Sequence, residues 1–395
     1  MRKGSRTART SRTRGTQPHH PRLRAEPLST RPSSQGDALL SLQDLSVPYV
    51  LSGHSALDHY LGHMLRFPIL VSTELSLPEL AARMPELRYP SLGFCDAAAA
   101  HEGHSSAILF RTADSDHRPY YDVLDFHYDP ITDRFLDPRD VYTQIRSMDI
   151  EEPAGDPDVH AFIEAAVLVS RYRFSPHPLD WPARVTLDAT HQRVLLSMIL
   201  TGKRAHAGLQ YLWDSGFVAA HWPELLPMNE TDHSKEQHPE GNVWSHTLET
   251  MRYRKVPELR LSLALLLHDI GKPHSRAEGG YRFAKHASIG TAQARRFMRR
   301  LGIQDELQDD VAWMVHSHMI PGALARLPVS RVGDTMAHPL FPELLELFRC
   351  DLSSTFTGPE KYYEACKRYR GYLKHQRNPF RDAEGKKRFK LFVAG

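Results

Sequence analysis

The spacing of apolar residues divides the chain near residue 150. After residue 158 apolar side chains recur every three or four positions, as in AFIEAAVLVSRYRF (161–174) and FPELLELFRC (341–350), a pattern that predicts amphipathic helices. Before residue 150, short β-type runs such as PYVLSG, FPILVST and YYDVLDFHYDP alternate with turn-forming residues, and one helical stretch is expected around Ser55 to Leu65. The pattern predicts an α+β fold in which a small α/β domain precedes an all-α remainder.

The segment PELRLSLALLL (257–267) stops abruptly at His268 and Asp269. It is apolar nearly all round, which predicts a buried helix, and Gly271 and Pro273 are residues that end a helix. A buried ionised aspartate is costly unless a cation, a metal or several donors accompany it. The pair therefore indicates a metal or charged site, with a hydrogen-bonded structural pair as the alternative.

Further metal-capable side chains lie on separate predicted helices: His246 in NVWSHTLETM, His286 in HASIGTAQARRF, His316 and His318 in VAWMVHSHM, and Asp351 in ELFRCDLSS. Imidazole and carboxylate groups converging from separate helices are typical of sites for Mn, Fe, Co, Ni or Zn, and the histidines argue against a site for Mg alone. Helix positions two apart point about 200° away from each other. Only one of the last two histidines should face the site, and we favour His318.

These residues carry a family resemblance. Their order resembles the H…HD…D signature of HD-domain metal-dependent phosphohydrolases. HPEGNVWSHTLETM, LLLHDIGKP, RFAKHASIGTAQARRFMRRLG and VAWMVHSHM are similar to the HD domain attached to bacterial tRNA nucleotidyltransferases (CCA-adding enzymes) and poly(A) polymerase-like proteins. The similarity covers most of residues 237–352.

The resemblance implies roles for individual residues. One metal would be bound by four ligands: His246, His268, Asp269 and Asp351. His286 and His318 match extra histidines that complete a second metal in some HD branches. Lys272 would contact a substrate phosphate, with a solvated lysine as the alternative, and His238 is a weaker candidate behind the ligands.

The implied chemistry is phosphate-ester hydrolysis. A divalent ion lowers the pKa of bound water and polarises a phosphoryl oxygen, and Asp269 would bridge two ions or orient the water. The catalytic residues would be His268, Asp269 and Lys272, and the substrates nucleotides or RNA ends.

The resemblance continues toward the amino terminus, where it weakens. YDPITDRFLDPRDVYTQIRS resembles the segment after the catalytic strands of a nucleotidyltransferase head, DPDVHAFIEAAVLVSRYRF its neck helix, and LQYLWDSGFVAAHWPELLPM the approach to the HD domain. In LSGHSALDHYLG the residues Gly53, Ser55 and Asp58 keep the family pattern, whereas His54 and Leu57 replace a glycine and an arginine.

The metal-binding Asp-x-Asp of the head is also replaced. Pro68 and Leu70 stand at its two positions in FPILVSTELS. Asp122, Asp125 and Asp129 lie nearby, but turn and surface roles explain them equally well. Nucleotidyl transfer needs carboxylates that hold two ions, so we expect a head that keeps the fold and has lost transfer activity.

The expected organisation has five parts: a disordered basic tail (1–37), a degenerate nucleotidyltransferase-like head (38–150), a helical neck (151–230), an all-α HD domain (231–356) and a basic carboxy-terminal tail or helix (357–395). The first tail is an inert segment, a transit-like sequence, a nucleic-acid arm or translation from an upstream start. The last, KYYEACKRYRGYLKHQRNPFRDAEGKKRFKLF, suits phosphate contacts and base stacking or an ordinary amphipathic helix.

Composition adds little. With 395 residues, 41% hydrophobic, the chain can bury one or more cores, and no apolar stretch approaches the length of a membrane span, which favours a cytoplasmic protein. Cys95, Cys350 and Cys366 suggest reduced thiols, and the net charge of +3 is too small to indicate nucleic acid.

Three functions remain open. The favoured one is a metal-dependent phosphohydrolase acting on nucleotides or tRNA-like RNA. The alternatives are a tRNA- or RNA-binding protein with a structural metal and an active CCA-adding or poly(A) polymerase-like nucleotidyltransferase. The pattern does not determine the oligomeric state.

Overall fold

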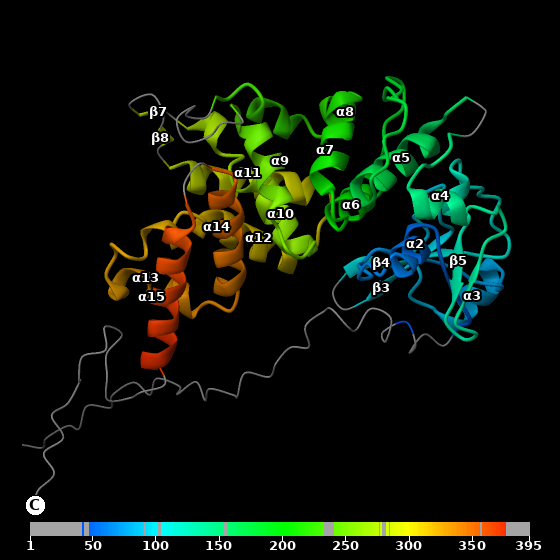
Figure 1. Cartoon of the computed structure of the whole chain (residues 1–395), viewed down its shortest axis with the longest axis horizontal. Helices are drawn as coiled ribbons and strands as arrows, with labels where there is room; N and C mark the ends of the chain where they lie inside the picture. Colours follow the sequence, from blue (N-terminus) through cyan, green and yellow to red (C-terminus); the bar gives the residue numbers. More distant parts are fainter. Residues whose placement is uncertain are drawn as a thin grey trace, which may run out of the picture.

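The computed structural model describes residues 42, 47–90, 92–101, 104–152, 156–232, 241–275, 277–278, 282–283, 285–355 and 358–376. The expected tail at 1–37, the end of the chain from residue 377, and His238 lie outside the described residues. In Figure 1 the strands β3 Ala97–His101, β4 His104–Arg111 and β5 His127–Asp129 lie at one end of the molecule, and helices α13 Val329–Ala337 and α15 Glu360–Gln376 lie at the other.

A six-stranded sheet occupies the amino-terminal part. Its strands are β1 Val50–Ser52, β2 Ile69–Ser72, β3 Ala97–His101, β4 His104–Arg111, β5 His127–Asp129 and β6 Arg134–Leu136, in the order β3-β4-β2-β1-β5-β6. β2 and β4 are parallel, and the other neighbours are antiparallel. The predicted runs PYVLSG and FPILVST contain β1 and β2, so a sheet in this region is confirmed.

Several details of the expectation were wrong. The helix expected to reach Leu65 is α2, His54–Tyr60; it ends early because Gly62 turns the chain with a φ of 64°. In the described part of the region before residue 150, α3 Leu77–Arg83 and α4 Tyr142–Ser147 are also helical. The run YYDVLDFHYDP holds the 3₁₀ turn η1 Asp122–Leu124 before β5 begins.

Alternate residues of the strands enter different cores. In β2, Ile69 and Val71 pack into one apolar cluster with Phe110, while Leu70 belongs to a second cluster with Phe162 and other residues of the helices that follow. The period of two follows from strand geometry. The sheet is therefore covered by helices on the face that carries Leu70.

The chain beyond residue 158 is mostly helical, as predicted. The first group of helices comprises α5 Val159–Arg171, α6 Ala189–Leu200, α7 Ala205–Asp214 and α8 Phe217–His221, and it is followed by the 3₁₀ turn η2 Pro223–Met228. The second group comprises α9 Val243–Arg252, α10 Leu259–Leu267, α11 His286–Arg300, α12 Asp305–Ser317, α13 Val329–Ala337, α14 Phe341–Ser353 and α15 Glu360–Gln376. Two 3₁₀ turns, η3 Lys272–His274 and η4 Pro321–Ala323, interrupt it. A small hairpin, β7 Ala277–Glu278 and β8 Arg282–Phe283, departs from the all-α expectation.

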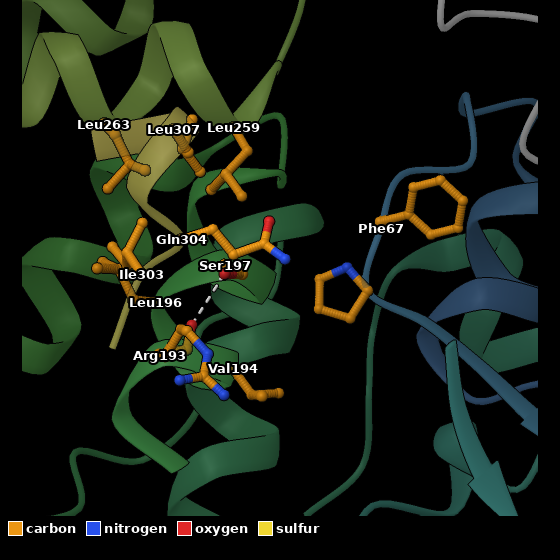
Figure 2. Close-up of a pocket in the computed structure, with 11 residues that line it drawn as sticks. Phe67, Arg193, Val194, Leu196, Ser197, Leu259, Leu263, Ile303, Gln304 and Leu307 are labelled. Carbon is orange, nitrogen blue, oxygen red and sulfur yellow. Dashed lines mark hydrogen bonds between the residues drawn. The ribbon is translucent and has the colours of Figure 1, made fainter. Parts of the chain in front are cut away.

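The sheet and the helices are joined by specific contacts. Arg66 before β2 donates to the Glu258 carboxylate at the start of α10, with 2.5 Å between Nη1 and Oε1. Beside this ion pair lies a cavity of about 40 Å³. In Figure 2, Phe67 lies on its sheet side, and Ser197, Leu259 and Gln304 lie on its helical side. None of the described helices is both long and apolar enough to cross a membrane.

Candidate metal centre

Helix α10 delivers His268 and Asp269 into the interior. Seven of its residues are buried, from Leu261 to Leu267, and His268 is its C-cap residue. Gly271 then packs against the start of α11, where an added Cβ would lie 2.1 Å from the carbonyl oxygen of His286. This close approach requires glycine and brings His286 next to the His-Asp pair.

Four other helices supply the remaining side chains. His246 lies on α9, His286 is the first residue of α11, His318 caps the end of α12, and Asp351 lies on α14. The four histidines concerned and Asp269 are buried, whereas the Asp351 side chain is 24% exposed. Asp351 therefore marks the side of the cluster that is open to solvent.

The six side chains form two groups of possible ligands. His246, His268 and Asp351 make one, and Asp269, His286 and His318 make the other; within each group the ligand atoms all lie within 4.8 Å of one another. Asp269, the fourth member of the expected single-metal set, is grouped with His286 and His318 but also lies close to His246 and His268.

The Asp269 carboxylate lies between the two groups. Its Oδ2 is 3.3 Å from His268 Nε2 and 3.7 Å from His246 Nε2, while its Oδ1 is 3.6 Å from His286 Nε2 and 3.8 Å from His318 Nε2. One oxygen faces each group, so the carboxylate can contribute one ligand atom to each.

Three histidines are oriented by backbone carbonyls. The Nδ1 atoms lie 2.8 Å from Leu265 O for His268, 2.9 Å from Phe283 O for His286 and 2.7 Å from Val315 O for His318. A carbonyl oxygen only accepts, so each Nδ1 carries the proton and each Nε2 of a neutral ring presents a lone pair to the centre.

Among the described residues, the Nε2 atoms of these rings form no hydrogen bond with any group other than one another. His286 Nε2 and His318 Nε2 face each other at 3.1 Å, and His268 Nε2 is buried without a hydrogen-bond partner among the described residues. Burial lowers the pKa of His318 to about 4 and also lowers the pKa of His286, so both rings are neutral near pH 7. Buried acceptors that converge in this way fit a divalent cation.

Comparison with known proteins identifies this helical region. A family profile described as "HD domain" matches residues 242–348, a range that holds five of the six side chains and ends just before Asp351. The chain contains an HD domain.

Two curated relatives are similar to longer parts of the chain. A CC-adding tRNA nucleotidyltransferase of Thermus thermophilus is 30% identical over 211 residues, 50% of this chain and 46% of that protein. A Multifunctional CCA protein of Halorhodospira halophila is 30% identical over 129 residues, 30% of this chain and 31% of that protein. The chain thus matches less than half the length of either relative. A solved complex of a CCA-adding enzyme with ATP aligns with 85% of this chain and 83% of its own at 14% identity and a TM-score of 0.38.

Lys272 and His316, two further residues considered from the sequence, lie in different surroundings. Lys272 Nζ lies 2.6 Å from Asp269 Oδ2 and its side chain is 12% exposed, so it is an ion-pair partner of the centre and not a solvated lysine. His316, two residues from His318, is exposed on the outside of α12.

The three retained head residues lie apart from the HD domain and have structural contacts. Gly53 adopts a φ of 54°, and a Cβ there would lie 3.1 Å from Leu70 Cδ2. Ser55 Oγ accepts a hydrogen bond from Leu70 N at 2.9 Å. Asp58 Oδ2 is 2.5 Å from Arg171 Nη1, and its Oδ1 accepts from the Tyr172 hydroxyl at 2.9 Å.

The other head acids also have local partners. Asp129 accepts from Ile131 N at 2.8 Å within a turn. Asp125 Oδ2 accepts from Arg139 Nε at 2.8 Å, and Asp122 lies 3.8 Å from the same nitrogen. At the two positions expected for metal-binding aspartates, Leu70 is buried at 4% exposure and Pro68 accepts through its carbonyl from the His54 ring at 3.3 Å.

One further side chain at the centre was not anticipated from the sequence. Ser354, the cap residue of α14, lies with its Oγ 3.2 Å from His246 Nδ1. The only available signal was its spacing of one helical turn from Asp351, which is too common to single out a serine.

Proposed function

We propose that the HD domain binds one or two divalent metal ions and hydrolyses phosphate esters of nucleotides or RNA ends. The observation that carries this proposal is the Asp269 carboxylate, which turns one oxygen to each of two ligand groups. A structural metal site needs four ligands that close around one ion. Five further possible ligands around the Asp269 carboxylate favour a catalytic site.

The residues divide between the two ions. His246, His268 and Asp351 would hold one, and Asp269, His286 and His318 the other. Such ions supply a hydroxide near neutral pH and polarise a phosphoryl oxygen. Four imidazoles among the ligands favour Mn, Fe, Co, Ni or Zn over Mg alone.

The chain's own groups prepare the site for an anionic substrate. Lys272 places an ammonium group 2.6 Å from Asp269 Oδ2, and its Nζ also lies 5.6 Å from the centre of the Phe283 ring. This charge is positioned at the edge of the ligand cluster, where it attracts a phosphate. Asp351, on the open side, lies where the substrate would approach.

The head, proposed as residues 38–150, would keep its fold without transferring nucleotides. Leu70 brings an apolar side chain to a metal-binding position and packs against Gly53. Asp58 is engaged by Arg171 and Tyr172, so it is not available to hold an ion. Residues 151–230 would be the neck and 231–356 the HD domain.

The alternative is a protein that binds tRNA-like RNA or adds nucleotides to it. The observation in its favour is the similarity over 211 residues to a CC-adding tRNA nucleotidyltransferase. In that case the metal of the HD domain is structural. The replaced carboxylates of the head count against the transferase version.

The proposal is tested by measuring hydrolysis with Mn, Co, Ni, Zn or Mg added. The substrates are a panel of nucleotides, cyclic nucleotides and RNA with 3′-phosphate ends. We expect metal-dependent hydrolysis that disappears in Asp269→Ala and persists in His316→Ala, a matched change outside the centre. In parallel, incorporation of CTP and ATP into tRNA lacking its 3′ end should be absent. If no added metal supports hydrolysis, or if hydrolysis survives in Asp269→Ala, the phosphohydrolase proposal is wrong. Nucleotide incorporation into tRNA would establish the nucleotidyltransferase alternative.

A further inference from the structure

His246 is enclosed by a single turn of α14. Its Nε2 lies 3.0 Å from the Asp351 side-chain oxygen Oδ1, and its Nδ1 lies 3.2 Å from Ser354 Oγ. His246 and Ser354 are both buried, at 0% and 5% exposure. Each ring nitrogen therefore faces one end of the segment 351–354.

The proton positions in this contact follow from the carbonyl of Asp351. Ser354 Oγ lies 2.7 Å from Asp351 O, which can only accept. The serine hydroxyl has one proton, and this carbonyl receives it. Toward His246 the hydroxyl oxygen can then only accept, so the proton in that contact belongs to Nδ1 of the histidine. The Asp351 carboxylate also only accepts, so without a metal ion Nε2 donates to it.

His246 differs in this respect from the other three histidines of the centre. His268, His286 and His318 each direct Nδ1 to the carbonyl three residues earlier. His246 lies inside α9, Val243–Arg252, where the preceding carbonyls accept the helix's own hydrogen bonds. Its Nδ1 instead contacts Ser354, the cap residue of α14.

We propose that Ser354 is a positioning residue of the metal centre. Its Oγ accepts the Nδ1 proton of His246, which leaves Nε2 as the ring nitrogen that would release its proton and bind an ion together with His268 and Asp351. The metal-binding part of this inference rests on the proposed function, whereas the position of the proton does not.

The competing explanation is that Ser354 only caps α14. Ser353 provides the matched control, because its Oγ donates to Arg349 O at 2.7 Å, the same kind of bond to a preceding helix carbonyl. Ser353 is the neighbouring residue, and in the described part of the chain its hydroxyl forms no hydrogen bond with a histidine of the centre. A helix-capping effect would appear in both serine variants, but a positioning effect only at Ser354.

Nuclear magnetic resonance of protein labelled with ¹⁵N in histidine tests the proton position without added metal. We expect the wild type and Ser353→Ala to show the His246 proton on Nδ1, protected from exchange with water. Ser354→Ala should lose this protected proton, and Ser354→Thr, which keeps a hydroxyl, should retain it. A protected Nδ1 proton in Ser354→Ala, or a neutral wild-type ring protonated on Nε2, would overturn the proposal.

Competitive zinc titration of the same four proteins tests the consequence. We expect Ser354→Ala to bind zinc about 10–100-fold more weakly, the usual effect of removing a partner behind a ligating histidine, with Ser353→Ala and Ser354→Thr unchanged. Equal affinities in Ser354→Ala and wild type would also overturn the positioning role. If the wild type binds no metal, the proposed function fails, and the proton position still decides the role of Ser354.

Discussion

The Nε2 atoms of His286 and His318 lie 3.1 Å apart, although the two residues are 32 positions apart in sequence. His286 is the first residue of α11, and His318 caps the carboxy-terminal end of α12. The start of α11 and the end of α12 therefore lie side by side at the candidate metal centre. Each ring is held by a carbonyl at Nδ1. Two acceptors are thereby forced together in a buried place, an arrangement that a shared cation stabilises.

Removal of one of these two rings should eliminate one ion. In His318→Ala the group with Asp269 and His286 retains two ligands, and we expect its metal affinity to fall at least about a hundredfold, since partners that lie behind ligands already contribute 10–100-fold. Metal content per chain, measured by mass spectrometry after dialysis, should fall in His318→Ala and not in His316→Ala. The same loss in both variants would contradict the assignment.

Gly271 should be intolerant of even one added methyl group. In Gly271→Ala the Cβ would meet His286 O at 2.1 Å and Gly290 N at 2.4 Å, both backbone atoms, so α11 must shift. We expect the free energy of unfolding to fall by about 1–3 kcal/mol and metal affinity to fall with it. Thermal and urea denaturation, with zinc titration, measure both effects.

Gly371 in α15 is the control for this change. Nothing lies within 4 Å of a Cβ placed there, and alanine is preferred to glycine in a helix by about 1 kcal/mol. Gly371→Ala should leave stability unchanged or raised. A loss of stability as large as that of Gly271→Ala would show that glycine replacement is generally harmful and not specific to the contact with α11.

A restored carboxylate in the sheet should not restore a metal site. Leu70→Asp removes a buried leucine, which costs about 2–5 kcal/mol, and places a carboxyl group against Gly53 and the apolar cluster on that face. We expect a less stable protein with no nucleotide incorporation into tRNA. Leu136→Asp, at a position 46% exposed, should change the stability little. Transfer activity in Leu70→Asp would show that the head needs only one of its two missing acids.

Asp58 should make the stability of the sheet region depend on acidic pH. Burial raises its pKa, but Arg171 and the hydrogen bond from His63 outweigh this and hold the pKa of Asp58 below its ordinary value. Because the folded-state pKa lies below the unfolded value of about 3.9, the contribution is present above that pH and is lost as the pH falls through the folded pKa.

Asp58→Asn should remove this pH dependence. The variant leaves the Arg171 charge buried without its partner, which destabilises by about 3–5 kcal/mol at neutral pH, and its stability should then fall less between pH 5 and 3 than that of the wild type. Urea denaturation at both pH values measures the difference. Asp116→Asn, at an exposed position, should behave like the wild type, and an identical acid response in Asp58→Asn would exclude the ion pair as its cause.

The sequence by itself determined the helical region and the residue types of the centre. The apolar segment before His268 predicted a buried helix, and this helix ends at Leu267, so that His268 and Asp269 follow it inside the protein. Helical periodicity also separated His318 from His316, because two residues that are two positions apart in a helix point in nearly opposite directions whatever surrounds them. Local geometry was sufficient for these conclusions.

Tertiary structure decided what local signals do not encode. The strand β3 contains an alanine run with little strand preference, and only its pairing with β4 makes it a strand. The position of Asp269 between two ligand groups depends on the approach of Gly271 to α11, and the contact of Ser354 with His246 depends on how α14 packs on α9. These are distances between segments far apart in the chain, and the packing of the whole helical region determines them.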